Sequence, residues 1–290
     1  MNKISVVYCS HNEELNIEES IKSINVFANE IIFVDLESTD KTVEIAKKMG
    51  AKIYKHKNLG FVEPVRNFGI SKTTGDWILI LYPDEKLPES LKMFLKKEIE
   101  KPRAQFFRIP RKNIIFGKWM KHTGWWPDFN IRFFKKGHVS WNEVIHSVPM
   151  TQGKGFDLEA KEELAIIHNN YTSLENYIEK MFRYSKVQAS ELIKGGYKFK
   201  WSDIIKKPLN EFLSRFFARE GYKDGFHGLV LSLLQSFSEL LVYLRIWETL
   251  KYEEKEINKK ELSDVINSSI GDIKWWMRDT FSWLKILKLR

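Results

Sequence analysis

Two adjacent carboxylates, Asp84 and Glu85, directly follow an apolar run and are the first candidates for chemistry in this chain. The run, Trp77–Leu81, predicts a buried strand of the parallel type. Pro83 ends the strand because proline has no N–H for a sheet ladder. Paired carboxylates at such a place suit a hard divalent cation, which takes oxygen ligands and binds phosphates. The alternative is an acidic loop that leads into a helix at Pro88.

The elements that position these carboxylates alternate between apolar strands and amphipathic helices. Strands are predicted at Ile4–Tyr8, Ile31–Val34 and Ala51–Tyr54, with a helical pattern after each of the first two. This alternation predicts right-handed crossovers and a parallel sheet. The loops that follow the strands then collect at one edge, where open α/β sheets bind ligands.

The second half of the chain has a different pattern of apolar and polar residues. Short strands are predicted from Phe106, on either side of a glycine- and aromatic-rich loop at Phe116–Asp128. Helices dominate after Thr172, with a long apolar helix at about Leu229–Trp247 and a last helix from Asp272. This half is therefore expected to add a helical region to the sheet.

Composition limits the class of protein. The 290 residues can form one large domain or two small ones. A single cysteine, Cys9, excludes a disulfide framework and fits a reducing, cytoplasmic compartment. Neither a signal peptide nor a spanning helix is expected. The 47 basic against 38 acidic residues give a net charge of +9, yet no zinc spacing or RNA-binding motif accompanies it, so no nucleic-acid partner is predicted.

Together these segments resemble the family 2 glycosyltransferases of the GT-A fold, and among them the lipopolysaccharide core β-1,4-glucosyltransferase group. The resemblance runs from Ile4 to about Leu234. The matching segments are ISVVYCSHNEELNIEESI, EIIFVDLESTDKTVEIAKKMGAKIY, VRNFGISKTTGDWILILYPDE, GWWPDFNIRFF, W-x-x-x-I-H and, more weakly, EGYKDGFHGLVLSLL. Their combination is far more specific than any single motif.

The resemblance implies a GT-A, Rossmann-like α/β fold: a mixed, mainly parallel sheet with helices on both faces, plus a C-terminal helical region. It implies a glycosyltransferase domain over residues 1–170, in which 1–100 contact the nucleotide-sugar and 101–170 the acceptor. Residues 171–290 are then a helical extension. The sequence carries no signal for an oligomeric state.

The activity implied by the resemblance is inverting transfer of a sugar from a nucleotide-sugar, by default a UDP-hexose, to a hydroxyl group. The acceptor would be a glycan or a lipid-linked envelope molecule such as the lipopolysaccharide core. The alternative is a catalytically degenerate sugar-nucleotide-binding or scaffold protein, because Tyr82 and Ser147 replace carboxylates that the family carries.

Residues in the first loops become candidate contacts to the nucleotide-sugar. Asp35 can accept hydrogen bonds from a base or ribose, or approach the next helix as a cap. Asn12 and Glu13 are similar candidates, with helix capping as their alternative.

Two arginines are candidates for the diphosphate. Arg66, next to Asn67, can bind a diphosphate through its planar guanidinium, or pair with Glu63 three residues earlier. Arg132 resembles a late basic residue that the family places near the diphosphate.

The resemblance also implies a divalent cation, Mn²⁺ or Mg²⁺, on Asp84, the second carboxylate of a D-x-D-E motif. Tyr82 stands where the first aspartate is expected. A phenol is a poor ligand for a hard cation until it ionises, and its ordinary pKa is ~10. Metal dependence is therefore open. Glu85 is a candidate to compensate for the missing aspartate, or to contact the sugar or acceptor.

A general base must take the proton of the acceptor hydroxyl. Asp128 is favoured, because desolvation in its aromatic loop is expected to raise its pKa. His146 and Glu143 are the other candidates. Trp125 and Trp126 either stack on sugar rings or form part of the core.

The C-terminal helix predicts contact with an anionic membrane surface. Its basic residues stand beside tryptophans, as in helices that lie in the membrane interface, so a peripheral place on the inner face of the cytoplasmic membrane is expected. The alternative is a helix that packs on the rest of the protein. The residues concerned are Lys274, Arg278, Lys285, Lys288 and Arg290 with Trp275, Trp276 and Trp283.

Overall fold

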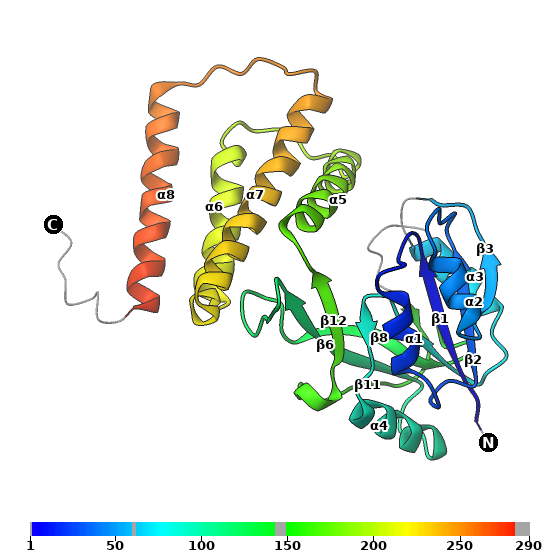
Figure 1. Ribbon diagram of the computed structural model, residues 1–290. Coiled ribbons are helices and arrows are strands. Elements are labelled where there is room, and N and C mark those ends of the chain that lie inside the picture. The colour runs from blue at the N-terminus through cyan, green and yellow to red at the C-terminus, as the bar shows by residue number, and fades with distance from the viewer. Residues whose placement is uncertain (1, 60–61, 143–148, 282–290) are drawn as a thin grey trace. The chain divides into compact units, whose positions relative to one another are not determined.

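A computed structural model describes residues 2–59, 62–142 and 149–281 (Figure 1). The chain forms two compact units. The first, here called the sheet unit, comprises residues 1–114 and 127–170. The second, here called the helical unit, comprises residues 115–126 and 171–290, so the loop at 115–126 belongs with the helices that follow the sheet in sequence.

Four parallel strands form the first half of the sheet. They are β1 (Ile4–Ser10), β2 (Glu30–Asp35), β3 (Lys52–Lys55) and β4 (Trp77–Ile80). β1 pairs in parallel with both β2 and β4, and β2 pairs with β3, which gives the order β3-β2-β1-β4. The carboxyl ends of these strands therefore share one edge, as the sequence pattern predicts.

Antiparallel strands extend the sheet beyond β4. β8 (Asp128–Lys135) pairs with β4 on one side and with β6 (Phe106–Ile115) on the other. β12 (Ile166–Tyr171) is next in order and pairs with the two-residue β5 (Glu85–Lys86). The remaining elements of the sheet unit are β9 (Val139–Ser140), β10 (Met150–Thr151), β11 (Gly155–Asp157) and the 3₁₀ turn η1 (Glu162–Leu164).

Helices cover both faces of this sheet. α1 (Ile17–Ser23), α2 (Thr42–Lys48) and α4 (Glu89–Glu100) contribute to one hydrophobic cluster, and α3 (Glu63–Ser71) contributes to the other. Alternate residues of β1 join opposite clusters, as expected for a strand buried on both faces. The predicted GT-A type of fold class is confirmed.

Glycine allows α3 to lie close to the sheet. A Cβ atom built on Gly69 would approach Val7 Cγ1 to 2.7 Å and Val34 Cγ2 to 3.1 Å. A larger residue at this position would push α3 away from β1 and β2. Because Arg66 lies one turn earlier on α3, this close packing helps to fix its position.

The helical unit is built from long helices. α7 (Phe226–Thr249) packs against α5 (Leu174–Lys194) and α6 (Asp203–Leu213). α8 (Lys259–Thr280) begins 13 residues before the predicted Asp272, because residues 259–271 are helical as well and Asn258 caps the first turn. The short elements are β7 (Lys118–Trp119), the π-helical turn η2 (Ser214–Ala218) and the 3₁₀ turn η3 (Gly221–Asp224).

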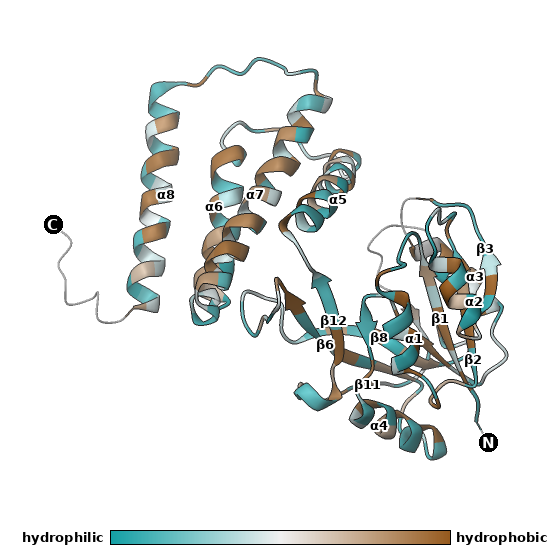
Figure 2. Ribbon diagram, viewed as in Figure 1, coloured by the Kyte–Doolittle hydropathy of each residue, from teal (hydrophilic) through white to brown (hydrophobic). Residues whose placement is uncertain are grey.

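α7 is long and apolar enough to cross a membrane, by length and composition alone. This differs from the expectation of no spanning helix. Figure 2 shows hydrophobic colour along much of α7, and 28% of its apolar window is buried within the protein. Phe226, Leu233 and Phe237 are among its exposed side chains.

Candidate active site at the carboxyl edge of the sheet

Side-chain hydrogen bonds link the loops that follow β1 and β2. Asn12 has a positive φ of 53°, and its Oδ1 accepts a hydrogen bond from Thr39 N at 2.8 Å. Asp35, which is 3% exposed, accepts a hydrogen bond from Ser38 N at 3.0 Å. Asn12 N donates in turn to Ser38 Oγ at 3.1 Å. The structure thus brings Asn12 and Asp35 into one loop cluster. The Asp35 contact closes a turn at Ser38 and does not cap the next helix, because α2 begins at Thr42 with Lys41 as its N-cap.

Two other predicted nucleotide contacts also have partners within the protein. The Asn67 amide donates to Trp141 O at 2.7 Å and accepts from Trp141 N at 3.0 Å. Both ends of this amide are therefore engaged with Trp141, which gives Asn67 a structural role, and its contact with the nucleotide stays a prediction. Glu13 accepts a hydrogen bond from Asn16 Nδ2 at 2.8 Å.

A cluster of Arg66, Tyr82 and Arg132 lies at the end of β4. The Arg66 guanidinium donates to the Tyr82 hydroxyl and stands 5.6 Å from the centre of its ring. The Arg132 guanidinium stands 4.3 Å from the same ring centre. Arg66 also lies 5.3 Å from the ring centre of Trp141. The side chain of Glu63, the alternative partner of Arg66, lies outside the described residues.

Glu85 is part of the interior. Its side chain is 0% exposed and accepts hydrogen bonds from Arg132 Nη2 at 2.8 Å and from Tyr82 N at 3.0 Å. Arg111 Nη1 lies 3.5 Å from the same carboxylate. The predicted contact of Glu85 to a sugar or acceptor is therefore wrong for this structure, because the carboxylate is buried against the arginines that it holds.

Loss of the Glu85 charge is expected to destabilise the fold. In Glu85→Gln the buried Arg132 keeps its charge without its partner, which costs about 3–5 kcal/mol in comparable buried pairs. Urea unfolding followed by circular dichroism would measure this loss. Glu89→Gln is the matched control, because Glu89 pairs with Lys92 while 83% exposed and should change stability by less than ~1 kcal/mol. Equal unfolding midpoints for the two variants would contradict the assignment.

Asp84 faces His168, a residue that the sequence analysis did not select. His168 lies opposite Glu85 in the antiparallel pairing of β12 with β5, and Asn169 N donates to Asp84 O at 2.9 Å. This pairing places His168 Nε2 3.4 Å from Asp84 Oδ2. The Asp84 side chain is 16% exposed and the His168 side chain 8% exposed.

Hydrogen bonds assign the tautomer of His168. Asn113 Nδ2 donates to Asp128 Oδ2 at 3.1 Å, so the amide oxygen of Asn113 faces His168 Nδ1 at 2.7 Å and must accept its proton. With the proton on Nδ1, a neutral ring presents its Nε2 lone pair to the Asp84 carboxylate. Two lone pairs that face each other require a positive charge between them, either a proton or a metal ion.

The donor set fits a divalent cation with two protein ligands. Imidazole nitrogen and carboxylate oxygen together suit ions such as Mn²⁺. Two adjacent ligands of an octahedral ion, each ~2.1 Å away, are separated by ~3 Å, close to the observed 3.4 Å. The described residues contain no cluster of three or more His, Cys, Asp or Glu side chains that could hold a metal. Substrate or water could complete the ligand set around Asp84 and His168.

Asp128 lies at the start of β8, directly opposite Arg111 on β6. Its Oδ2 accepts from Arg111 Nη2 at 2.6 Å and from Asn113, and its Oδ1 accepts from Asn130 Nδ2 at 2.9 Å. Burial opposes ionisation of this carboxyl, but the Arg111 charge and these hydrogen bonds outweigh burial, so the pKa of Asp128 lies below its ordinary value. The prediction of a raised pKa is wrong, because the sequence did not reveal Arg111 as a partner.

The predicted aromatic residues lie in the helical unit. Trp125 packs edge-on to Tyr171 with ring centres 6.1 Å apart, and Arg215 stands 5.8 Å from the centre of a Trp125 ring. Trp126 packs edge-on to Trp119 at 5.2 Å. Both tryptophans are partly buried, so each contributes to the packing of its loop.

Asp224 anchors the loop that carries these tryptophans. Its carboxylate accepts hydrogen bonds from His122 N at 2.8 Å and from His122 Nδ1 at 3.0 Å. Arg215 Nη1 donates to Thr123 O at 3.0 Å. The weak sequence match around EGYKDGFHG thus corresponds to an element that holds the aromatic loop. The base candidates Glu143 and His146, and Ser147 beside them, lie outside the described residues.

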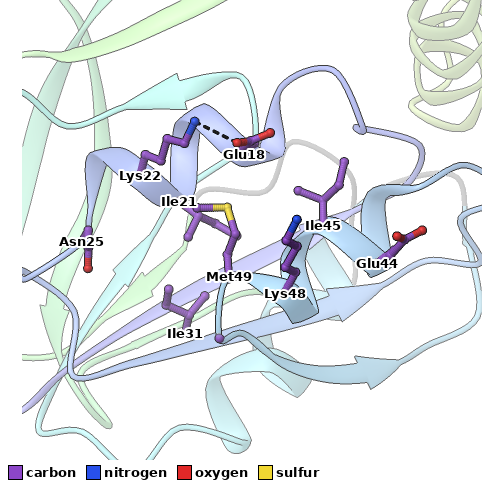
Figure 3. A pocket seen from close by; sticks show the side chains of 10 residues that line it. Glu18, Ile21, Lys22, Asn25, Ile31, Glu44, Ile45, Lys48 and Met49 are labelled. Carbon is purple, nitrogen blue, oxygen red and sulfur yellow. Dashed lines mark ion pairs between the residues drawn. The ribbon is translucent and has the colours of Figure 1, made fainter.

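A separate hollow of about 630 Å³ lies between α1 and α2 (Figure 3). Its lining includes Ile21, Ile45 and Met49, with the Glu18–Lys22 ion pair of 2.8 Å beside them. None of the candidate site residues lines it. We therefore assign it no part in the chemistry.

The chain is similar to one protein family over about half of its length and to individual proteins over most of their length. The family model described as "Glycosyl transferase family 2" matches residues 5–153. An uncharacterized glycosyltransferase of Rickettsia typhi is 31% identical over 261 residues, which cover 86% of this chain and 88% of that protein. One of Rickettsia felis is 30% identical over 274 residues, covering 90% and 95%. The solved structure of S. aureus TarS 1-349 in complex with UDP-GlcNAc is 15% identical with a TM-score of 0.45, covering 84% and 91%.

Proposed function

Because the chain belongs to glycosyl transferase family 2 and is a glycosyltransferase, we propose that it moves a sugar from a nucleotide-sugar, UDP-hexose by preference, to a hydroxyl group with inversion. The observation that carries the proposal is the line of contacts Asp84–His168–Asn113–Asp128 at the carboxyl edge of the sheet. It joins a candidate cation site to a candidate base. Residues 1–170 are proposed as the catalytic domain and 171–290 as its helical extension.

We assign binding of the donor diphosphate to positively charged groups. Arg66 and Arg132 would bind its oxygens, and Asn12 and Asp35 would contact the nucleoside. Asp84 and His168 would hold a divalent cation, Mn²⁺ or Mg²⁺, which when bound neutralises charge on the leaving diphosphate. The arginines share this task because a guanidinium binds phosphate oxygens in bidentate fashion.

Asp128 is proposed as the general base. Its lowered pKa keeps it ionised at neutral pH, so it is ready to accept the proton of the acceptor hydroxyl. Arg111 and Asn113 fix its Oδ2, and Asn130 its Oδ1, so the carboxylate is held in one orientation. A fixed base favours single displacement, since the hydroxyl is held in line with the leaving group.

A panel of donors tests the proposal. The purified protein is incubated with UDP-, GDP- and dTDP-hexoses and Mn²⁺, and release of nucleoside diphosphate is measured without an added acceptor. We expect slow hydrolysis of one donor class, since water can replace the acceptor. Binding without release would support the alternative of a degenerate sugar-nucleotide-binding protein. Neither binding nor release with any donor would contradict the proposed function.

The acceptor is proposed to be a glycan or a lipid-linked envelope molecule, such as the lipopolysaccharide core, at the inner face of the cytoplasmic membrane. The support is the surface of the helical unit, where Phe226 is 77% and Trp275 58% exposed. Lys274 and Arg278 are exposed beside Trp275 on α8. Trp276 instead stacks on Phe217 of the same unit, so α8 also has a packed side. The other residues of the predicted basic helix lie beyond the described range.

Vesicle binding tests the membrane proposal. The full chain is expected to co-sediment with vesicles that contain phosphatidylglycerol and to bind less to phosphatidylcholine vesicles. Lys274→Glu/Arg278→Glu should weaken this binding ~10-fold or more, since each basic residue near an anionic surface contributes about 1 kcal/mol. Lys47→Glu/Lys48→Glu, on α2, is the matched control and should bind as the wild type does. Equal binding by both double variants would remove α8 from the proposal.

A further inference from the structure

Tyr82 is in contact with two guanidinium groups. Arg132 lies 4.3 Å and Arg66 5.6 Å from the centre of its ring, and Arg66 also donates to its hydroxyl. A guanidinium within ~6 Å of an aromatic ring centre is attracted by the ring without losing its charge. Tyr82 therefore holds two cations close together through a neutral side chain.

The two arginines are anchored differently. Arg132 is 4% exposed and ion-paired with the fully buried Glu85. Its Nε is buried and has no hydrogen-bond partner among the described residues. Arg66 is partly exposed on α3 and meets the aromatic rings of Tyr82 and Trp141. The cluster thus contains the buried Arg132, whose Nε–H donor is unused among the described residues. It also contains the partly exposed Arg66, which the Tyr82 hydroxyl orients.

The neutral Tyr82 changes the charge balance at this position. A carboxylate beside Arg66 and Arg132 would form ion pairs with them and cancel part of their charge. Tyr82 orients the same groups without adding a negative charge beside them. Two guanidinium groups that face one site are suited to the several oxygens of a diphosphate.

We propose that Tyr82 is a positioning residue that holds Arg66 and Arg132 as a diphosphate-binding pair, so that this chain binds a nucleoside diphosphate without a divalent cation. The inference rests on the proposed function, in which these arginines receive the donor diphosphate. It assigns the affinity for the diphosphate to the arginines. A cation on Asp84 and His168 is then needed for transfer and not for binding.

Calorimetric titration with UDP, UMP and uridine tests this, once in Mn²⁺ and once in EDTA. The wild type is expected to bind UDP in EDTA within ~3-fold of its affinity in Mn²⁺, which corresponds to a small free-energy difference. Tyr82→Phe should lose roughly 10-fold in UDP affinity in both buffers, as one charge-assisted hydrogen bond would give, with uridine affinity unchanged. Tyr252→Phe, an exposed tyrosine of the helical unit, is the matched control.

Tyr82→Asp is the second variant, and it adds the negative charge that Tyr82 lacks. Its carboxylate should pair with the arginines, so UDP affinity should fall more than ~10-fold in EDTA and recover in Mn²⁺, because two carboxylates hold a cation better than one. A merely structural role for Tyr82 would lower uridine and UDP affinity alike, and that result would overturn the inference.

The titrations separate this inference from the proposed function. Wild-type UDP binding that is lost in EDTA overturns the inference and leaves the function intact, and it needs no variant to fold. Tyr82→Phe that binds UDP in EDTA as tightly as the wild type does would also overturn the inference and leave the function intact. Absence of binding to UDP, GDP and dTDP in both buffers would instead contradict the proposed function.

Discussion

Asp128→Asn is expected to reduce sugar transfer by about 10²–10⁴-fold, the range usually supplied by a general base. The amide has nearly the shape of the carboxylate but cannot accept the proton of the acceptor hydroxyl. Nucleotide affinity should remain near the wild-type value, because Asn12 and Asp35 lie on other loops and Arg132, four residues further along β8, is held by its ion pair with Glu85. Donor hydrolysis under single-turnover conditions, together with calorimetric binding of UDP, would measure both quantities.

Asn130→Ala is the control for this variant. It removes one hydrogen bond to Asp128 Oδ1 but keeps the carboxylate and its pairing with Arg111. Its effect on transfer should therefore be much smaller. Near-normal turnover in Asp128→Asn would remove Asp128 from the mechanism and return attention to Glu143 and His146.

The pH dependence of transfer should reflect the pKa of Asp128. A lowered pKa means that the carboxylate is ionised above, and for some distance below, the ordinary value of ~3.9. Protonation of Asp128 therefore contributes no loss of transfer between pH 5 and pH 8. If an acidic limb appears in that range, another group causes it, and Asp128→Asn should leave the position of that limb unchanged.

Asp84→Asn is expected to lower transfer by roughly 10²–10³-fold, on the scale of losing one group that stabilises charge in the transition state. A neutral amide oxygen is a weaker ligand for a hard cation and leaves the lone pair of His168 without an anionic partner. Activity should rise with added Mn²⁺ in the variant more than in the wild type. Rates measured across a Mn²⁺ series would show this shift.

His168→Gln is the companion variant. If both residues hold one cation, each variant should require more Mn²⁺ for half-maximal activity, and the double variant should lose little beyond the worse single one. Mn²⁺ binding followed by electron paramagnetic resonance gives a readout that does not depend on turnover. Unchanged Mn²⁺ affinity in both variants would place the cation elsewhere.

The parallel half of the fold follows from local pattern. β1, β2 and β4 are apolar runs bounded by polar loops, so their type, order along the chain and common edge are predictable. Asp84, Asp35 and Arg66 could be selected because each belongs to a loop or helix next to such a strand. The resemblance to family 2 glycosyltransferases strengthened each of these selections.

Residues on the antiparallel strands were harder to select. Arg111, Lys112 and Asn113 follow one another on β6, as His168, Asn169 and Asn170 do on β12. No alternation of polar and apolar residues therefore marked the face that carries the site. Which strand lies beside which depends on long-range pairing that no local window contains. The lowered pKa of Asp128 depends on that pairing, since Arg111 reaches it only through the β6–β8 register.

The path of the chain between its two units limits how the protein can be divided. It leaves the sheet unit after residue 114, returns at Pro127 and leaves again after Asn170. A fragment that stops at residue 170 would keep the loop at 115–126 but lose Tyr177, Met181 and Leu231, which bury Ile115 and Met120. Such a fragment would expose apolar surface and tend to aggregate. A smaller soluble catalyst would therefore require redesign of this loop as well as removal of the helices.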